Sequence, residues 1–318
     1  MTSEAVANRV RTPYSRVLTR VAGIVIVIWG AATLSFLVLH LTPGDPVDIM
    51  LGTQSTASPE LKESIRVDMG LDRPVAEQYV SYLGNLAKLD FGQSYRLQKP
   101  VIEVLGEQLP STLQLAGLAI VISVGLALLI AYASRRARTR SAASLLELVA
   151  VSFPSFWTGI LLLTVFSFQL RWFPVAGGSG FGALVLPAVT LALPIAGILS
   201  QVLRHGLEVA NEQPFVSTAQ ARGLSFGQLL SRHTLRHAAL PVVTLSGYIV
   251  GGMLGGAVIV EQLFGRSGLG RVTLDAITNR DLPVVMALVV LAAVVFVVVN
   301  LVVDLVYPLL DPRLRSAR

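Results

Sequence analysis

The sequence of 318 residues contains no cysteine. Without a thiol the chain can form no disulfide framework and no thiolate metal site, and thiol redox chemistry is excluded. Charged residues are also scarce, at 14% of the chain, whereas 53% of the residues are hydrophobic and the mean hydropathy is +0.68. A soluble domain of this length does not need so much apolar surface, so the composition indicates a polytopic integral membrane protein.

The motifs of several enzyme classes are missing as well. No G-x-x-x-x-G-K-[ST] run is present to hold a nucleotide, and no H-E-x-x-H pair is present to hold zinc. Two G-x-S-G strings, 177–180 and 265–268, could present a serine as an intramembrane protease does. A serine nucleophile needs a base, and all four histidines are expected at other places in the fold: His40, His205, His233 and His237. We therefore expect a chain that is not an enzyme, with no catalytic, metal or cofactor site of its own.

Six runs with few or no charges are each long enough to cross a bilayer as a helix, which takes roughly 20 residues. The first run is expected to be retained and not cleaved as a signal sequence, because it exceeds a secretory apolar region and no small-residue cleavage site follows. The runs predict an all-α fold with six transmembrane helices, at 21–41, 108–134, 148–170, 172–203, 238–260 and 282–303.

The distribution of lysine and arginine predicts the orientation. The tail 1–20, the loops 135–147 and 204–237, and the tail 304–318 together hold 15 of the 25 basic residues. The remaining 10 lie in connections on the other side, most of them in a segment that is net acidic. Cytoplasmic segments carry the excess of Lys and Arg, so both termini are expected in the cytoplasm. The net charge of +6 then reflects topology, and nucleic acid is not an expected partner.

The segment 42–109 is too long for a simple connection and is expected outside the cytoplasm. Ser58-Pro59-Glu60 starts one predicted helix, which Gly70 can close, and an apolar face from Val75 to Leu86 predicts a second helix. The pair could form a small subdomain or could lie on the membrane surface as amphipathic helices. The later outer loops, 171–182 and 261–283, are short and rich in glycine.

The cytoplasmic loop 204–237 has the clearest local pattern. Pro214 suits the first position of a helix, and Gly223 suits the left-handed position just after its end. Ser225 and Gln228 have the spacing of a capping box at the start of a second helix. From Pro214 the first helix is about 13 Å long, too short to span a bilayer but long enough to fill a groove on a partner.

Within the predicted spans, polar side chains are few and no carboxylate is expected in mid-span, so the pattern does not favour an ion-coupled carrier. Small residues recur every fourth position in the fifth run, which suits helix packing or the lining of a pathway. The candidate pathway residues are Gln114, Gln201, Gly247, Gly251 and Gly255.

In this order the motifs resemble the permease subunits of bacterial ATP-binding-cassette (ABC) importers for dipeptides, oligopeptides and nickel, the DppB/OppB-like permeases. The resemblance covers nearly the whole chain. The motifs that show the resemblance are 41–46 (LTPGDP), 70–74 (GLDRP), 153–157 (FPSFW), 218–224 (TAQARGL), 240–241 (LP), 268–270 (GLG), 300–304 (NLVVD) and 310–313 (LDPR). Ser217 and Gln220 depart from it, because relatives often carry arginine there.

The resemblance implies a type I ABC importer permease fold, with a core at 110–303, and a place in the inner (plasma) membrane of a bacterial cell. It implies as partners a second homologous permease, two ATPase subunits that bind ATP and Mg²⁺, an extracytoplasmic substrate-binding protein and a short-peptide substrate. The short cytoplasmic helix would sit in a groove of an ATPase subunit through Phe215, Val216, Ala219, Arg222 and Gly223. A nickel or glutathione importer is the alternative within the family, and an ATP-independent channel or carrier is the alternative outside it.

Overall fold

The computed structural model describes residues 13–41, 43–51, 58–68, 70–134, 137–178 and 180–310. Residues 1–12 and 311–318 of the predicted tails, and with them Thr42, Met69, Arg135, Arg136 and Ser179 of the sequence, lie outside the described residues. The long helices are α1 (Pro13–Leu41), α5 (Val101–Ala133), α6 (Ala137–Ser152), α8 (Gly182–Asn211), α11 (Leu235–Leu263) and α13 (Leu282–Leu310).

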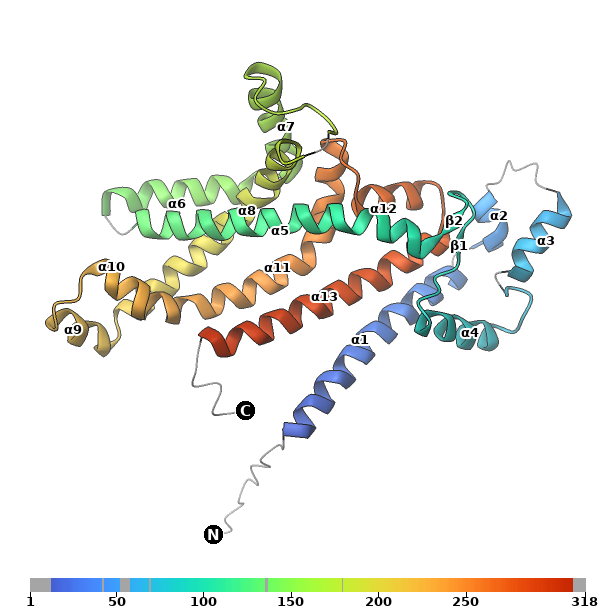
Figure 1. Ribbon diagram of the computed structural model, residues 1–318, viewed down its shortest axis with the longest axis horizontal. Helices are drawn as coiled ribbons and strands as arrows, with labels where there is room; N and C mark the ends of the chain where they lie inside the picture. The colour runs from blue at the N-terminus through green and yellow to red at the C-terminus, as the bar shows by residue number, and fades with distance from the viewer. Residues whose placement is uncertain are drawn as a thin grey trace, which may run out of the picture.

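The shorter elements lie mainly at the two ends of the molecule (Figure 1). One end carries α9 (Pro214–Ala221), α10 (Phe226–Leu229) and the π-helical turn η2 (Leu230–Thr234), and we call it the elbow end. The other, which we call the hairpin end, carries α2 (Pro46–Leu51), α3 (Pro59–Asp68), α4 (Val75–Ala87), α12 (Leu269–Thr278) and the strands β1 (Gln93–Ser94) and β2 (Lys99–Pro100). The strands pair antiparallel, Gln93 with Pro100, which adds a small hairpin to a fold that the sequence predicts as all-α.

Four helices in the described part of the chain are long and apolar enough to cross a membrane: 18–41, 101–133, 182–211 and 282–310. Two bent pairs pass the same test, 139–152 with 155–169 and 235–253 with 255–263. Counting each pair as one span gives six, so the structure has four to six spans rather than six uninterrupted helices. The helices also run past the predicted boundaries, since α5 begins at Val101 and α13 continues to Leu310.

The third predicted span, 148–170, is not one continuous helix. The chain breaks at Phe153-Pro154, and α7 (Ser155–Leu162) with the π-helical η1 (Leu163–Gln169) leaves α6 at 104°. A proline donates no N–H to a helix and disfavours helical geometry in the residue before it, so α6 ends before Pro154, which is extended (φ −58°, ψ 141°) and precedes the first residue of α7. The fourth predicted run is also shortened, because its helix begins only at Gly182.

The core lies where α5, α8 and α11 cross. Its fully buried positions include Leu115 and Ala119 from α5, Ala188 and Ala192 from α8, and Ala257 from α11. Small side chains at these crossings let the helix backbones approach closely, which is how apolar helices gain packing energy within a membrane. A polar link joins two of the helices, because the Ser123 hydroxyl donates to the Ala192 carbonyl at 3.2 Å.

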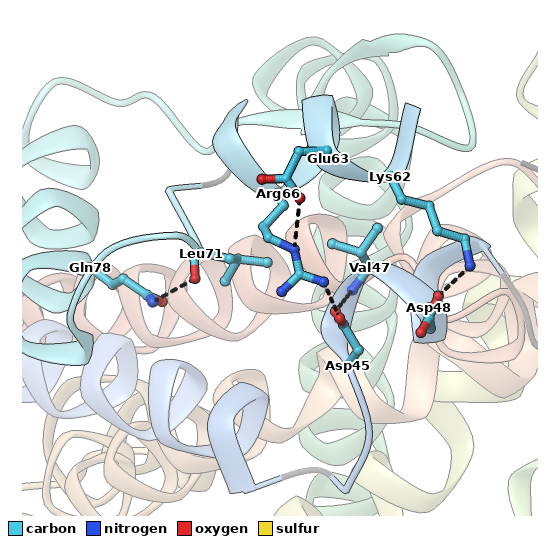
Figure 2. A network of polar contacts seen from close by, with 8 residues as sticks. All are labelled: Asp45, Val47, Asp48, Lys62, Glu63, Arg66, Leu71 and Gln78. Atoms are coloured by element: carbon cyan, nitrogen blue, oxygen red, sulfur yellow. Dashed lines mark hydrogen bonds and ion pairs between the residues drawn. The ribbon is translucent and has the colours of Figure 1, made fainter. Parts of the chain in front are cut away.

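The outer segment folds against itself and against α1. Both predicted helices form, as α3 and α4, whereas α2 is an additional short helix that the sequence patterns missed. Figure 2 shows that Asp45 joins α2 to α3, because its carboxylate accepts from the Val47 N–H at 2.9 Å and forms an ion pair with Arg66. Burial opposes ionisation of Asp45, but these partners outweigh it and lower the pKa of its carboxyl.

Helix α4 packs on the last turns of α1 through aromatic and polar contacts. The hydroxyls of Thr33 and Tyr79 lie 2.7 Å apart, and His40 Nε2 lies 3.0 Å from Gln78 Oε1. The phenol of Tyr82 is enclosed in the same contact, and burial raises the pKa of Tyr82 to about 12. Paired contacts of this kind fix α4 on α1, so the segment has tertiary structure in addition to its amphipathic pattern.

Candidate functional site

The elbow is a short exposed helix held between two turns whose backbone groups are satisfied locally. Helix α8 ends at Asn211, Gln213 is extended, and Pro214 opens α9 at the first helical position. At the far end Gly223 has a φ of +79°, as its predicted position requires. The Gly223 N–H donates to the Gln220 carbonyl at 2.9 Å and the Leu224 N–H to the Ala219 carbonyl at 3.2 Å, the two bonds of a Schellman motif.

The second turn of the elbow is the predicted capping box. The Ser225 N–H donates to Gln228 Oε1 at 3.0 Å, and the Gln228 N–H donates back to the Ser225 hydroxyl at 3.4 Å. The helix that starts here continues through α10 and η2 into α11. Helix α9 is therefore joined to α11 by one tight turn followed by a nearly continuous helix.

The inner side of α9 rests on its own chain. The Phe215 ring stacks on the His237 ring at 5.2 Å, and Val216 is only 5% exposed. Behind them α8 and α11 are closely apposed, because a Cβ on Gly206 would lie 3.0 Å from the Ala238 Cα. This backbone contact leaves room for no larger residue at Gly206, so the two helices that carry the elbow are held as a pair.

The five predicted contact residues divide between the two sides of α9. Arg222 and Gly223 are exposed, Phe215 and Ala219 are half-buried, and Val216 is buried within the chain. Further exposed side chains, which the sequence analysis did not select, complete the outer side: Ser217, Thr218, Gln220 and Ala221. Helical periodicity counted from an apolar Val216 could have found them.

Two buried carboxylates join helices, one near the elbow and one at the hairpin end, and the sequence analysis placed both in loops, 135–147 and 261–283. Glu147 on α6 is 1% exposed and pairs with Arg204 of α8 at 2.7 Å, and Arg204 also donates to Ser144 at 2.7 Å. A charge buried at this depth is stable only with such a partner. A span predicted from a run of apolar residues ends where a charged residue occurs, whereas the helices themselves continue through Glu147 and Arg204.

The second carboxylate, Glu261, holds the hairpin end together. It is fully buried, and its oxygens accept from the Thr112 hydroxyl at 2.7 Å and from the Gly270 N–H at 2.8 Å. Thr112 in turn accepts from the Leu269 N–H at 2.8 Å, so the first turn of α12 is capped by side chains from α5 and α11. A Cβ on Gly268 would overlap the carboxylate, which explains the glycine in the 268–270 motif.

The candidate pathway residues fall into two groups. Gln114, Gln201 and Gly255 are exposed, and nothing lies within 4 Å of the place where a Cβ on Gly255 would be. Gly247 and Gly251 instead pack on α13, where a Cβ would lie 2.6 Å from Val303 and Phe296 side-chain carbons respectively. The predicted stripe of small residues is thus divided between a helix contact inside the chain and an open surface.

Comparison with known proteins identifies the fold. The profile of the family described as binding-protein-dependent transport system inner membrane component matches residues 115–316, and the profile of its N-terminal region matches residues 14–116. This chain belongs to that family. The permease is 39% identical over 310 residues to a Brucella abortus protein named as a peptide transport system permease, with 94% of this chain and 98% of that protein covered.

Another relative is the Escherichia coli (strain K12) glutathione transport system permease protein GsiC, at 34% identity over 86% of the permease and 90% of GsiC. In structure the permease is similar to a crystal structure of an amino acid ABC transporter with histidines, with a TM-score of 0.50 and 19% identity over 64% of this chain and 92% of that chain. The permease is therefore a DppB/OppB-like membrane subunit of an ABC importer and an integral protein of the inner membrane. Membership of this family implies ATPase and substrate-binding partners in general.

Proposed function

We propose that the permease is one of two different membrane subunits that enclose a path for short peptides, driven by two ATPase subunits that dock on α9. The observation that carries the proposal is the elbow, a capped and exposed two-turn helix between two membrane helices. Such a helix has no partner on its outer side within the described chain. Its polar outer residues and its fixed ends suit insertion into a groove of another protein.

The proposed coupling between the ATPase subunits and the membrane helices follows from the contacts that attach the elbow. The Gly206–Ala238 contact and the Arg204–Glu147 ion pair tie α8 to α11 and α6, so a displacement of α9 turns these helices together. On this proposal ATP binding closes the ATPase pair and draws α9 inward, the helices tilt to open the hairpin end, and hydrolysis resets them. Val216 anchors the helix to its own chain, while Arg222, Gly223 and the outer side chains meet the ATPase.

Short peptides are the proposed substrates because the Brucella relative, with the higher identity and coverage, is named for peptide transport. Glutathione is the second candidate, on the 34% identity to GsiC, and it is itself a small peptide with two carboxylates. The proposed path runs past the exposed Gln114, Gln201 and Gly255, whereas Gly247 and Gly251 bring α11 close to α13. The elbow end and both termini are proposed to be cytoplasmic, and the segment formed by α2 to α4 to receive the binding protein.

The test of docking uses matched variants of α9. Ala219 lies at the border between the buried and exposed sides, so Ala219→Arg places a long cation at the centre of the proposed contact. The nearby Ser217→Ala removes only a hydroxyl that bonds within the helix to the Pro214 carbonyl at 2.9 Å. With membrane abundance matched, pull-down of the ATPase subunits should fail for Ala219→Arg and succeed for Ser217→Ala. Full binding and uptake by Ala219→Arg would refute docking through α9.

The substrate is tested in the same cells by uptake of a labelled dipeptide against labelled glutathione. Dipeptide uptake that requires both the permease and ATP supports the proposal. Uptake of glutathione alone would support the second candidate function, glutathione transport.

A further inference from the structure

We infer that a cavity at the hairpin end, centred on Arg266, binds the carboxylate of the substrate as it enters the membrane path. This inference rests on the proposed peptide function and names the chemical group that the permease itself recognises. The cavity lies between Ser111 and Gln114, in the third and fourth turns of α5, the start of α8 with the loop before it, and the loop that follows α11.

The cavity has the size of a small-ligand site. Its volume is about 480 Å³, within the roughly 300–1,000 Å³ typical of ligand pockets. Arg266 and Gln114 provide its long polar side chains, and Phe181, 70% exposed, provides an apolar ring at its edge. Gln114 is also one of the residues proposed to line the path, so the cavity opens where a substrate would pass.

Glycines form one wall of the cavity. The loops 172–178 and 264–268 meet there, with the Gly177 N–H donating to the Phe264 carbonyl at 2.9 Å. Gly177, Gly178 and Gly265 all have positive φ, at 61°, 95° and 58°, a geometry that side-chain-bearing residues rarely adopt. The described glycines add no side chains to this wall, so a ligand can approach their backbone closely.

The guanidinium of Arg266 is half-buried and lacks a close hydrogen-bond or ion-pair partner among the described residues. Burial lowers the pKa of its guanidinium, with the charge of Glu261 acting in the opposite direction. Its Nε is buried without a hydrogen-bond partner, and the hydrogen bond that its Nη2 forms within the described residues, to the Ser111 carbonyl, is long at 3.4 Å. Within the described residues Glu261 forms no ion pair with Arg266, and its oxygens accept instead from Thr112 and Gly270.

Other arginines of the fold show what a satisfied guanidinium looks like here. Arg204 has Glu147 at 2.7 Å, and Arg236 donates to the Leu310 carbonyl at 2.6 Å. A half-buried guanidinium that lacks such a partner favours an incoming anion, and its planar fork matches a carboxylate in two-point contact. Every unmodified peptide carries a C-terminal carboxylate, whatever its side chains, so a site for this group suits a permease of broad peptide range.

The experiment compares two ligands that differ only at this group, alanyl-alanine and its C-terminal amide. Uptake is measured at saturation by the complete importer, so that affinity of the binding protein does not limit the rate. Arg266→Gln should lower the maximal uptake of the free acid roughly tenfold and leave uptake of the amide unchanged. The control is Arg271→Gln, because Arg271 is exposed on α12, pairs with Asp275 at 3.8 Å and lines a neighbouring cavity instead.

Equal loss for acid and amide, or no loss for either, would overturn the inference. So would loss of the ATPase stimulation caused by unliganded binding protein, because Arg266 would then contact that protein and not the substrate.

A second measurement does not depend on transport. N-acetyl-alanyl-alanine labelled with ¹³C in its carboxylate is titrated with the purified importer complex and observed by NMR. Broadening of the carboxylate signal is expected with the parent protein and with Arg271→Gln, and not with Arg266→Gln. No broadening with the parent protein overturns the site even if peptides are transported. Broadening without peptide uptake supports the site and refutes the peptide function.

Discussion

Replacement of Gly223 by valine should uncouple the permease from its ATPase without unfolding it. At φ +79° a non-glycine residue is strained by about 1–3 kcal/mol, and a β-branched residue lies toward the upper part of that range. No clash adds to this cost, because nothing lies within 4 Å of the place where the Cβ would be. The effect is therefore confined to the backbone at the end of α9.

The magnitude follows from the equilibrium between the capped and uncapped helix end. A strain of about 2 kcal/mol shifts that equilibrium roughly 30-fold. If only the capped form docks, the apparent dissociation constant of the ATPase rises by up to the same factor. The two Schellman bonds, at 2.9 and 3.2 Å, favour the capped form and oppose the shift. The loss of ATPase binding should therefore increase with the strain that each substituted residue has at this φ. Gly223→Asn should have the smallest effect, Gly223→Ala an intermediate one and Gly223→Val the largest, since asparagine tolerates the left-handed region best.

The assay is pull-down of the ATPase subunits by solubilised permease, titrated at equal membrane abundance. The matched control is Gly227→Val, which adds the same side chain at an exposed glycine of α10 that has ordinary helical geometry and open space around it. Equal weakening by Gly223→Val and Gly227→Val would show that bulk and not backbone strain is responsible. Unchanged binding by Gly223→Val would refute the docking role of the cap.

Three further predictions concern the rest of the chain. For topology, Ser64→Cys should react with an impermeant maleimide in intact cells and Ser141→Cys should not; both sites are exposed, and the reverse pattern would invert the orientation. At the hairpin end, Gly268→Ala should displace the Glu261 carboxylate and increase hydrogen exchange in α12, whereas undiminished protection would show that the capping is dispensable. In the outer segment, Asp45→Asn should speed exchange in α3. Because the pKa of Asp45 lies below its ordinary 3.8, the stabilising ion pair is present above that pH and is lost as the pH falls through the lowered value. Equal protection of α3 at pH 6 and below the lowered pKa, after correction for the intrinsic pH dependence of amide exchange, would contradict this.

The sequence by itself determined the boundaries of the elbow and of the outer helices. Pro214, Gly223 and the Ser225–Gln228 box act through contacts within about five residues, so their spacing specifies the turns before any tertiary structure exists. Composition and long apolar runs predicted a membrane protein for a similar reason, because each spanning helix satisfies its own backbone hydrogen bonds and exposes no unpaired polar group to lipid. The order of the short motifs gave the family.

Only the tertiary structure decided which faces are buried and which charges are paired. Glu147 and Arg204 are 57 residues apart in the chain, and Thr112 and Glu261 are 149 apart, so no local pattern can show that they meet. The burial of Val216 against its own chain depends on how α9 packs back on the helices that carry it. The division of the α11 glycines depends on where α13 crosses. Side-chain exposure is a property of neighbours brought together by folding, which explains why the spans could be predicted from the sequence while the Arg266 cavity could not.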